Sequence, residues 1–339
     1  MVKRAKSLFL SRTFQRALST MTRSAMGAGA TSAKTKRVSS AGEHERAGVA
    51  ITATGPRRYR LFKPLDVRPN EKLPLMVMLH GCGQDAQGLS ASSRMNRIAE
   101  RHRFLVLYPE QERMANPQGC WNWFDTRTGR AQAEADSIDA TISQICLTQP
   151  VDPARIAVAG LSAGASMAAL LAMRHPERFR AVAIHSGIAP GVAHSSATAI
   201  SAMYGHRVTA ARAAPLPIGV HLPALLVIQG TADHTVAPSN GVEAARSWAD
   251  IEGAKASTSR TVQRGARYPM KVTDYRAKGR LLATCCEVVG LGHAWSGGAA
   301  GQAYSDPKGP DASSLIWTFV AKQVAVPRLQ KSLTTDSLM

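Results

Sequence analysis

The sequence predicts an α/β fold, in which a mostly parallel sheet carries helices on both faces. Short apolar runs typical of buried strands alternate along the chain with segments of helical periodicity. Such alternation is typical of parallel sheets that are covered on both sides. The chain has 339 residues, of which 45% are hydrophobic, so it is long enough to bury the core of one large domain.

Each element is expected from a local pattern of apolar and turn-forming residues. Strands are predicted at residues 58–64, 73–81, 104–110, 154–160, 181–187, 223–230 and within 271–290. Helices are predicted between them and after the last one, at residues 88–102, 132–148, 163–175, 240–253 and 313–323. Residues 111–130 form a loop that contains "GCWNWFD", and residues 189–221, rich in Ala, Pro and Gly, are expected to be irregular.

Charge and composition divide the chain into a basic segment at 1–45, a catalytic domain at 46–325 and a tail at 326–339. Residues 1–42 carry nine basic side chains and no acidic one, within a net charge of +19. This composition predicts disorder. The segment could contact an anionic surface such as a polymer granule. Nucleic acid is not an expected partner, because no aromatic residues interleave with the basic ones.

Targeting signals are weak in this sequence. No apolar run approaches the roughly 18 residues that a transmembrane helix needs. The short run "SLFL" is interrupted by Ser11 and Arg12, whereas a secretory signal needs a longer apolar stretch. The five cysteines show neither a CxxC pair nor zinc-ligand spacing, and their odd number leaves at least one unpaired. These observations favour a reducing, cytoplasmic compartment. The alternative, that one or two disulfides form within the chain, stays open.

The stretch "RIAVAGLSAGASMAALLAM", residues 155–173, places a serine between two glycines where a strand becomes a helix. G-x-S-x-G in this context is typical of a nucleophile elbow, a sharp turn that exposes the serine hydroxyl at the end of the sheet. The alternative is an ordinary turn serine between glycines. The flanking strand and helix favour the elbow, so Ser162 is predicted to be a nucleophile.

A serine nucleophile needs a base and an orienting acid, which follow it along the chain in this kind of fold. Seven histidines follow Ser162, and His293 alone among them lies after the last strand-like segment, in the glycine-rich loop "GLGHAWSGG". Asp233 comes directly after the buried run "ALLVIQG". His234 competes with His293 only by its proximity to this acid. The predicted triad is Ser162, Asp233 and His293.

Two further groups of residues complete the predicted site. An oxyanion hole needs two backbone N–H groups. Ala163, which follows the nucleophile, and Cys82, in the loop "HGCG" after an early strand, are the candidates. Trp121, Trp123 and Trp295 fall in loops near the site and are predicted to bind substrate, with core packing as the alternative for each. No metal or organic cofactor is expected.

Five sequence blocks, "LHGCGQDA", "CWNWFD", "VAGLSAGASMA", "GTADHTVAPSNG" and "GLGHAWSGG", resemble the signatures of poly(3-hydroxybutyrate) depolymerase-type esterases. That family is related to acetyl xylan and feruloyl esterases, and many of its members are extracellular. The resemblance spans about residues 75 to 300 and implies an α/β-hydrolase fold and hydrolysis of carboxylic esters. It implies the same triad, and an oxyanion role for Cys82.

The sequence therefore predicts a serine esterase that forms a covalent acyl-enzyme. The expected substrates are poly(3-hydroxybutyrate), its oligomers or short-chain esters. One alternative is an esterase that acts on acetyl or feruloyl groups of polysaccharides, with the same chemistry and a different groove. A second alternative is a non-catalytic protein on the same scaffold that binds granules or nucleic acid.

Overall fold

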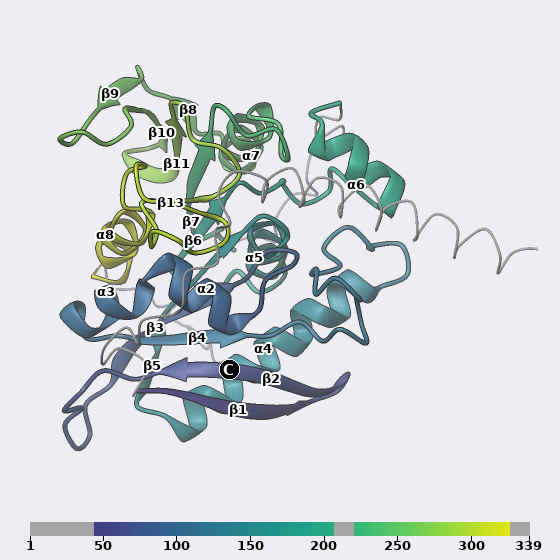
Figure 1. Cartoon of the computed structure of the whole chain (residues 1–339), viewed down its shortest axis with the longest axis vertical. Helices are drawn as coiled ribbons and strands as arrows, with labels where there is room; N and C mark the ends of the chain where they lie inside the picture. Colours follow the sequence, from purple (N-terminus) through teal and green to yellow (C-terminus); the bar gives the residue numbers. More distant parts are fainter. Residues whose placement is uncertain (1–43, 207–219, 326–339) are drawn as a thin grey trace, which may run out of the picture.

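A computed structural model describes residues 44–206 and 220–325 of the chain (Figure 1). The predicted basic segment and C-terminal tail lie outside these ranges, apart from residues 44 and 45. The domain boundaries proposed above therefore stay predictions.

The main sheet of the described residues has 11 strands, ordered β1-β2-β4-β3-β5-β6-β7-β11-β10-β8 with β9 beside β10. The six neighbours from β4 to β11 are parallel, and the strands at both edges are antiparallel. The strands are Glu45–Thr52 (β1), Gly55–Phe62 (β2), Leu73–Leu79 (β3), Leu105–Pro109 (β4), Val151–Leu161 (β5), Ala181–His185 (β6), Ala224–Gly230 (β7), Lys255–Ala256 (β8), Arg260–Val262 (β9), Met270–Ala277 (β10) and Arg280–Val288 (β11). A separate short pair joins Trp295–Ser296 (β12) to Ser305–Asp306 (β13).

Helices cover both faces of this sheet and enclose two apolar layers (Figure 1). One layer packs α4, α5 and α7 against the sheet, and the other packs α2, α3 and α8 against the opposite face. The helices are Ala86–Ser93 (α2), Met95–His102 (α3), Arg130–Thr148 (α4), Ala163–Arg174 (α5), Ser196–Met203 (α6), Ser239–Asp250 (α7) and Ala312–Val324 (α8). The predicted α/β class with a mostly parallel sheet is confirmed.

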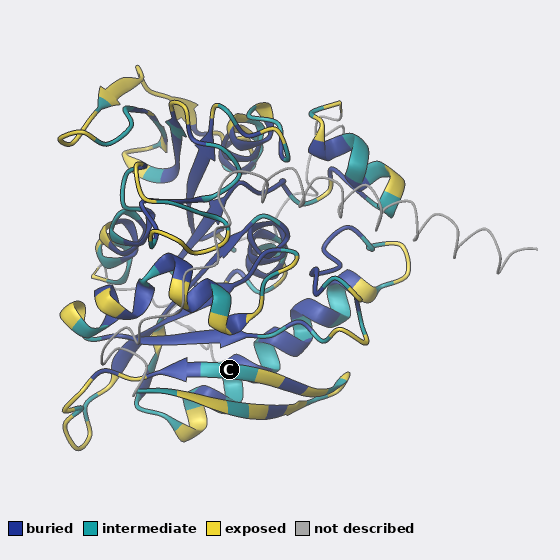
Figure 2. Cartoon of the chain, viewed as in Figure 1, coloured by how far each residue is buried: buried dark blue, intermediate teal, exposed yellow. Residues whose placement is uncertain are grey.

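Three local predictions need correction. The helix expected at 88–102 is divided into α2 and α3, because Arg94 adopts a left-handed conformation with φ of 57°. Part of the region expected to be irregular forms α6, whose first turn is held by a capping box from Ser195. The edge strand β1 was not predicted. It is exposed along much of its length, so it lacks the apolar run of a buried strand (Figure 2).

The parallel strands bring distant parts of the sequence to one edge of the sheet. His80 follows β3, Ser162 follows β5, Ser186 follows β6, and Asp233 lies three residues beyond β7. The carboxyl ends of parallel strands point the same way, and ligands bind in the crevice outside them. A ligand site is therefore expected at this edge.

Candidate active site

Ser162 lies in a strained turn between β5 and α5, with φ of 56° and ψ of −120°. A side chain at Gly160 would bring its Cβ to 2.3 Å from the backbone of Gly164, and a Cβ at Gly164 would lie 2.2 Å from the carbonyl oxygen of Leu79. Both positions therefore require glycine. The G-x-S-x-G pattern follows from this close approach of helix and strands, and strain of this kind is common at functional sites.

The first residue of α5, Ala163, lies beside Ser162 and lines a pocket together with Cys82. The first N–H groups of a helix have no partner within the helix and attract negative charge. The structure thus brings both candidate oxyanion donors to the cavity that Ser162 lines.

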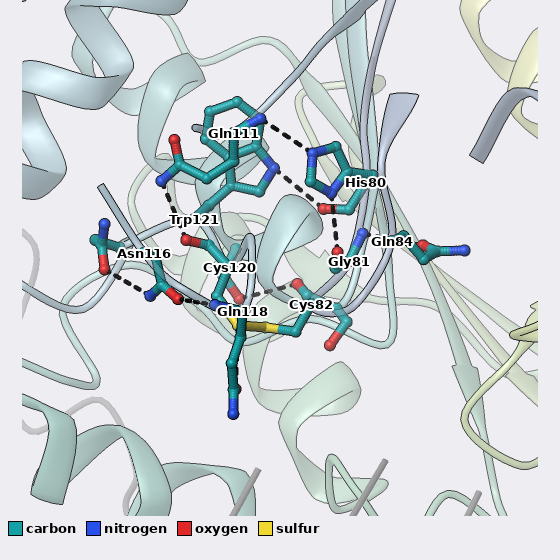
Figure 3. Close-up of a disulfide and its surroundings, with 12 residues drawn as sticks. His80, Gly81, Cys82, Gln84, Gln111, Asn116, Gln118, Cys120 and Trp121 are labelled. Atoms are coloured by element: carbon teal, nitrogen blue, oxygen red, sulfur yellow. Dashed lines mark hydrogen bonds between the residues drawn. A yellow bond between two sulfur atoms is a disulfide. The ribbon is translucent and has the colours of Figure 1, made fainter. Parts of the chain in front are cut away.

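The loop after β3 is joined at three points to residues 116–121 (Figure 3). A disulfide links Cys82 to Cys120. The backbone N–H of Gly83 donates to the carbonyl of Gln118 at 3.0 Å. The indole Nε1–H of Trp121 donates to the carbonyl of His80 at 3.1 Å. The disulfide was left open by the sequence, because its partners are 38 residues apart and in different loops.

His80 supports the same loop from within the core (Figure 3). Its Nε2 accepts a hydrogen bond from the backbone N–H of Gln111 at 3.1 Å, so its Nδ1 carries the proton. That Nδ1–H donates to the carbonyl of Gly81 at 2.9 Å. Burial lowers the pKa of His80 to about 4, which keeps the ring neutral near pH 7.

Asp233 and His293, the predicted acid and base, lie within hydrogen-bond distance of each other. The Nδ1 of His293 lies 2.8 Å from Oδ2 of Asp233, whose side chain is buried. The other oxygen, Oδ1, accepts from the backbone N–H groups of Thr235 at 2.9 Å and Val236 at 2.8 Å. Burial raises the pKa of Asp233. The hydrogen bond and charge of His293, with the two backbone N–H groups, outweigh burial and hold that pKa below its ordinary value.

The pocket collects most of the predicted site residues. Ser162, His293, Cys82 and Ala163 all line it. Its wall is largely apolar and aromatic, and includes Trp121, Trp123, Phe124, Ile188, Met203, Val236 and Tyr304. Such a wall suits an acyl chain or another apolar group beside a few converging polar atoms.

Trp295, which was predicted to bind substrate, is not among the residues that line this pocket. Its side chain is fully buried, its ring stacks on His185 at 5.3 Å, and its Nε1 donates to Ser313 at 3.2 Å. His185 in turn accepts from the backbone N–H of Ser296 through Nε2 at 3.1 Å. Burial lowers the pKa of His185 to about 3. Trp295 and His185 therefore support the loop that carries His293.

Sequence reasoning missed the supporting contacts of His80 and His185. Each lies at the carboxyl end of a parallel strand or directly after it, as does Ser162. That shared position was the available signal. Within residues 44–206 and 220–325, no cluster of His, Cys, Asp or Glu has the arrangement of a metal site. No helix in these ranges is long and apolar enough to cross a bilayer.

Comparison with known proteins identifies the family of the chain. The family model described as esterase PHB depolymerase matches residues 58–263. Poly(3-hydroxyalkanoate) depolymerase C of Paucimonas lemoignei is 31% identical over 264 residues, which cover 76% of this chain and 63% of the relative. Feruloyl esterase B of Neurospora crassa is 26% identical over 220 residues, covering 60% of this chain and 74% of the relative. The chain thus spans less than two thirds of the depolymerase.

Among solved structures, the acetyl xylan esterase from Aspergillus awamori matches with a TM-score of 0.57 at 20% identity, covering 74% of this chain and 93% of that one. This likeness confirms the α/β-hydrolase fold. The fold is thus that of the α/β-hydrolases, and the matching family is one of esterases. The chain belongs to the esterase PHB depolymerase family.

The predicted cytoplasmic compartment and the predicted granule contact gain no support from the structure or the comparisons. The Cys82–Cys120 disulfide is at odds with a reducing compartment, and nothing in the comparisons favours a cytoplasmic location. The basic segment proposed to contact granules lies outside the described residues, and no comparison supports such contact.

Proposed function

We propose that the chain hydrolyses carboxylic esters with Ser162 as nucleophile, His293 as general base and Asp233 as the acid that orients it. One observation carries this proposal: a serine on a strained elbow lines the same pocket as a histidine whose Nδ1 lies 2.8 Å from a buried aspartate. A serine hydroxyl is a weak nucleophile until an adjacent base accepts its proton.

The reaction then takes two steps. His293 accepts the proton of Ser162, and the serine oxygen attacks the ester carbonyl to form a tetrahedral intermediate. The backbone N–H groups of Cys82 and Ala163 stabilise its negative oxygen. His293 returns the proton to the departing alcohol, leaving an acyl-enzyme. Water, activated by the same imidazole, attacks the acyl carbonyl and releases the acid and the free serine.

For the substrate we propose poly(3-hydroxybutyrate), its oligomers or short-chain esters. The family assignment and the similarity to a poly(3-hydroxyalkanoate) depolymerase support this class. The apolar wall that contains Trp121 and Trp123 would accommodate short acyl units. The similarity to feruloyl esterase B and acetylxylan esterases supports the alternative, a carbohydrate esterase. Release of 3-hydroxybutyrate from amorphous polymer, compared with acetate from acetylated xylan and ferulate from feruloylated xylan, separates the two.

The nucleophile is tested by labelling with a fluorophosphonate and locating the adduct by peptide mass spectrometry. We expect one adduct, on Ser162, formed more slowly when amorphous poly(3-hydroxybutyrate) is present. Ser166 and Ser186 line the same pocket and serve as internal controls that stay unlabelled. Ser162→Ala is expected to lower kcat by about 10⁶-fold. An adduct on another serine, or a Ser162→Ala variant with normal turnover, would refute the assignment.

A further inference from the structure

Gln229, the penultimate residue of β7, lies beneath the Asp233 carboxylate and is 1% exposed. Its Nε2 lies 3.2 Å from Oδ2 of Asp233 and 3.1 Å from the carbonyl oxygen of Val236. The Asp233 carboxylate already accepts two hydrogen bonds from the backbone of the loop after β7. The proposed role of Asp233 as the orienting acid therefore does not by itself explain why Gln229 contacts it.

The neighbours of the Gln229 amide fix its orientation. Both Asp233 Oδ2 and the Val236 carbonyl are acceptors, so the NH₂ group must face them. The opposite atom, Oε1, is buried and has no hydrogen-bond partner among the described residues. Burying an acceptor without a donor is unfavourable. Gln229 therefore maintains its contact with Asp233 even though the acceptor of its amide, Oε1, has no partner among the described residues.

The packing of α7 holds Gln229 in this position. A Cβ at Gly241 would lie 2.6 Å from Cβ of Gln229 and 2.8 Å from its Cγ. The helix backbone thus approaches the side chain closely, and the absence of a side chain at Gly241 makes this approach possible. Gln229 has little room to turn away from Asp233.

Gln229 shares one carboxylate oxygen with His293. Oδ2 of Asp233 faces both His293 Nδ1, at 2.8 Å, and Gln229 Nε2, at 3.2 Å. A donor on a carboxylate oxygen stabilises its negative charge there, which weakens the attraction of that oxygen for an imidazolium ion. Groups that hydrogen-bond to a functional side chain commonly set both its orientation and its basicity.

We propose that Gln229 is a positioning residue that aims Oδ2 of Asp233 at His293 and thereby sets the pH dependence of catalysis. This inference rests on the triad proposed above. Asp233, from the loop after β7, and His185, from β6, are the titratable groups that interact with His293 in the described residues. His185 stays neutral because its burial lowers its pKa to about 3. His234, next to Asp233, is exposed.

The test is Gln229→Met, which keeps the length of the side chain and removes its donor. Without that donor, Oδ2 attracts the imidazolium form of His293 more strongly. The acid limb of the kcat/KM profile, measured with p-nitrophenyl butyrate, is expected to move to higher pH by about 0.5 to 1 unit. The loss of kcat on the plateau should be only a few-fold.

Asn240→Leu is the matched control. Asn240 is a buried amide on α7 that donates to the carbonyls of Ala202 and Ala237, at 2.9 and 3.2 Å. Its loss should lower the melting temperature without moving the acid limb. If Gln229→Met lowers the melting temperature and leaves the acid limb within about 0.2 unit of wild type, Gln229 is only structural and the proposal fails.

A second measurement on the unmodified protein covers the case in which Gln229→Met does not fold. With ¹⁵N-labelled glutamine, the side-chain amide signal of Gln229 should shift with the same midpoint as the acid limb. A signal that is flat across that midpoint overturns the proposal. Neither result bears on the nucleophile, whose failure would appear separately as a Ser162→Ala variant that retains turnover.

Discussion

The two sides of the pocket are built in different ways. The side proposed to hold the oxyanion, made of the loop after β3 and residues 116–121, is joined by a disulfide and two hydrogen bonds (Figure 3). The acid–base side, made of the loops that carry Asp233 and His293, is joined by hydrogen bonds such as Ala232 N–H to Leu291 O at 3.0 Å and Gly290 N–H to Thr231 Oγ1 at 3.0 Å.

This difference matches the work proposed for each side. Oxyanion donors stabilise developing charge best when they are fixed before the reaction begins. A general base must instead be held in one tautomer and orientation, which its hydrogen bond to the acid supplies. A covalent link suits the first task and a hydrogen-bonded loop the second. Perturbing each side should therefore give a distinct kinetic signature.

The largest effect is expected when the acid–base side loses its charge. Asp233→Asn should lower kcat by about 10⁴-fold, because an amide favours the wrong tautomer of His293 and cannot stabilise its imidazolium form. Steady-state kinetics with p-nitrophenyl butyrate measure this. Asp250→Asn, at the exposed end of α7, is the matched control and should be fully active. An Asp233→Asn variant that keeps a tenth of the wild-type kcat would contradict the triad.

A smaller effect is expected when the oxyanion side loses its covalent link. Cys120→Ala should lower kcat by about 10-fold, which is less than the 10² to 10³ that loss of a whole donor costs, because two hydrogen bonds still hold the loop. The acid limb of the pH profile should not move, unlike that of Gln229→Met. Kinetics are measured after circular dichroism confirms folding, since loss of a disulfide also costs stability.

Two controls make this second prediction specific. Cys146→Ala removes a half-buried free thiol on α4 and should leave kcat unchanged. A reductant should lower the kcat of the wild-type protein and have no further effect on Cys120→Ala. Full activity of the reduced wild-type enzyme would show that the disulfide stabilises the fold without positioning the oxyanion loop.

The sequence predicted the buried strands and the turn whose signals lie in neighbouring residues. The parallel strands are apolar runs between turn residues. The elbow at Ser162 needs glycines at fixed spacing, because a side chain at Gly160 or Gly164 would collide with neighbouring backbone atoms. The half-exposed β1 lacks that apolar signal. Long-range pairings were also missed. Cys82 and Cys120 meet only because two loops cross, and Trp295 faces the core since β12 turns it toward His185.

The last prediction concerns stability alone and is expected to leave the kinetics at neutral pH least affected; it rests on the two buried, neutral histidines. Burial lowers the pKa of His80 to about 4 and that of His185 to about 3. In the unfolded chain both would bind a proton near the ordinary value of about 6.5. The unfolded state therefore gains protons first as pH falls. The stability tied to these neutral rings is complete above about pH 6.5 and is lost toward pH 4.

Each histidine should contribute a slope of up to about 1.4 kcal/mol per pH unit to the free energy of unfolding in that window. Urea unfolding of wild type, His80→Gln and His185→Gln between pH 4 and 7 measures it, with the exposed His102→Gln as control. Each buried variant should flatten the slope, and the control should not. Equal slopes in all four proteins would mean that other groups govern acid unfolding. Because His80 supports the loop after β3 and His185 the loop of His293, unequal flattening would show which of these two supports contributes more to the loss of stability in acid.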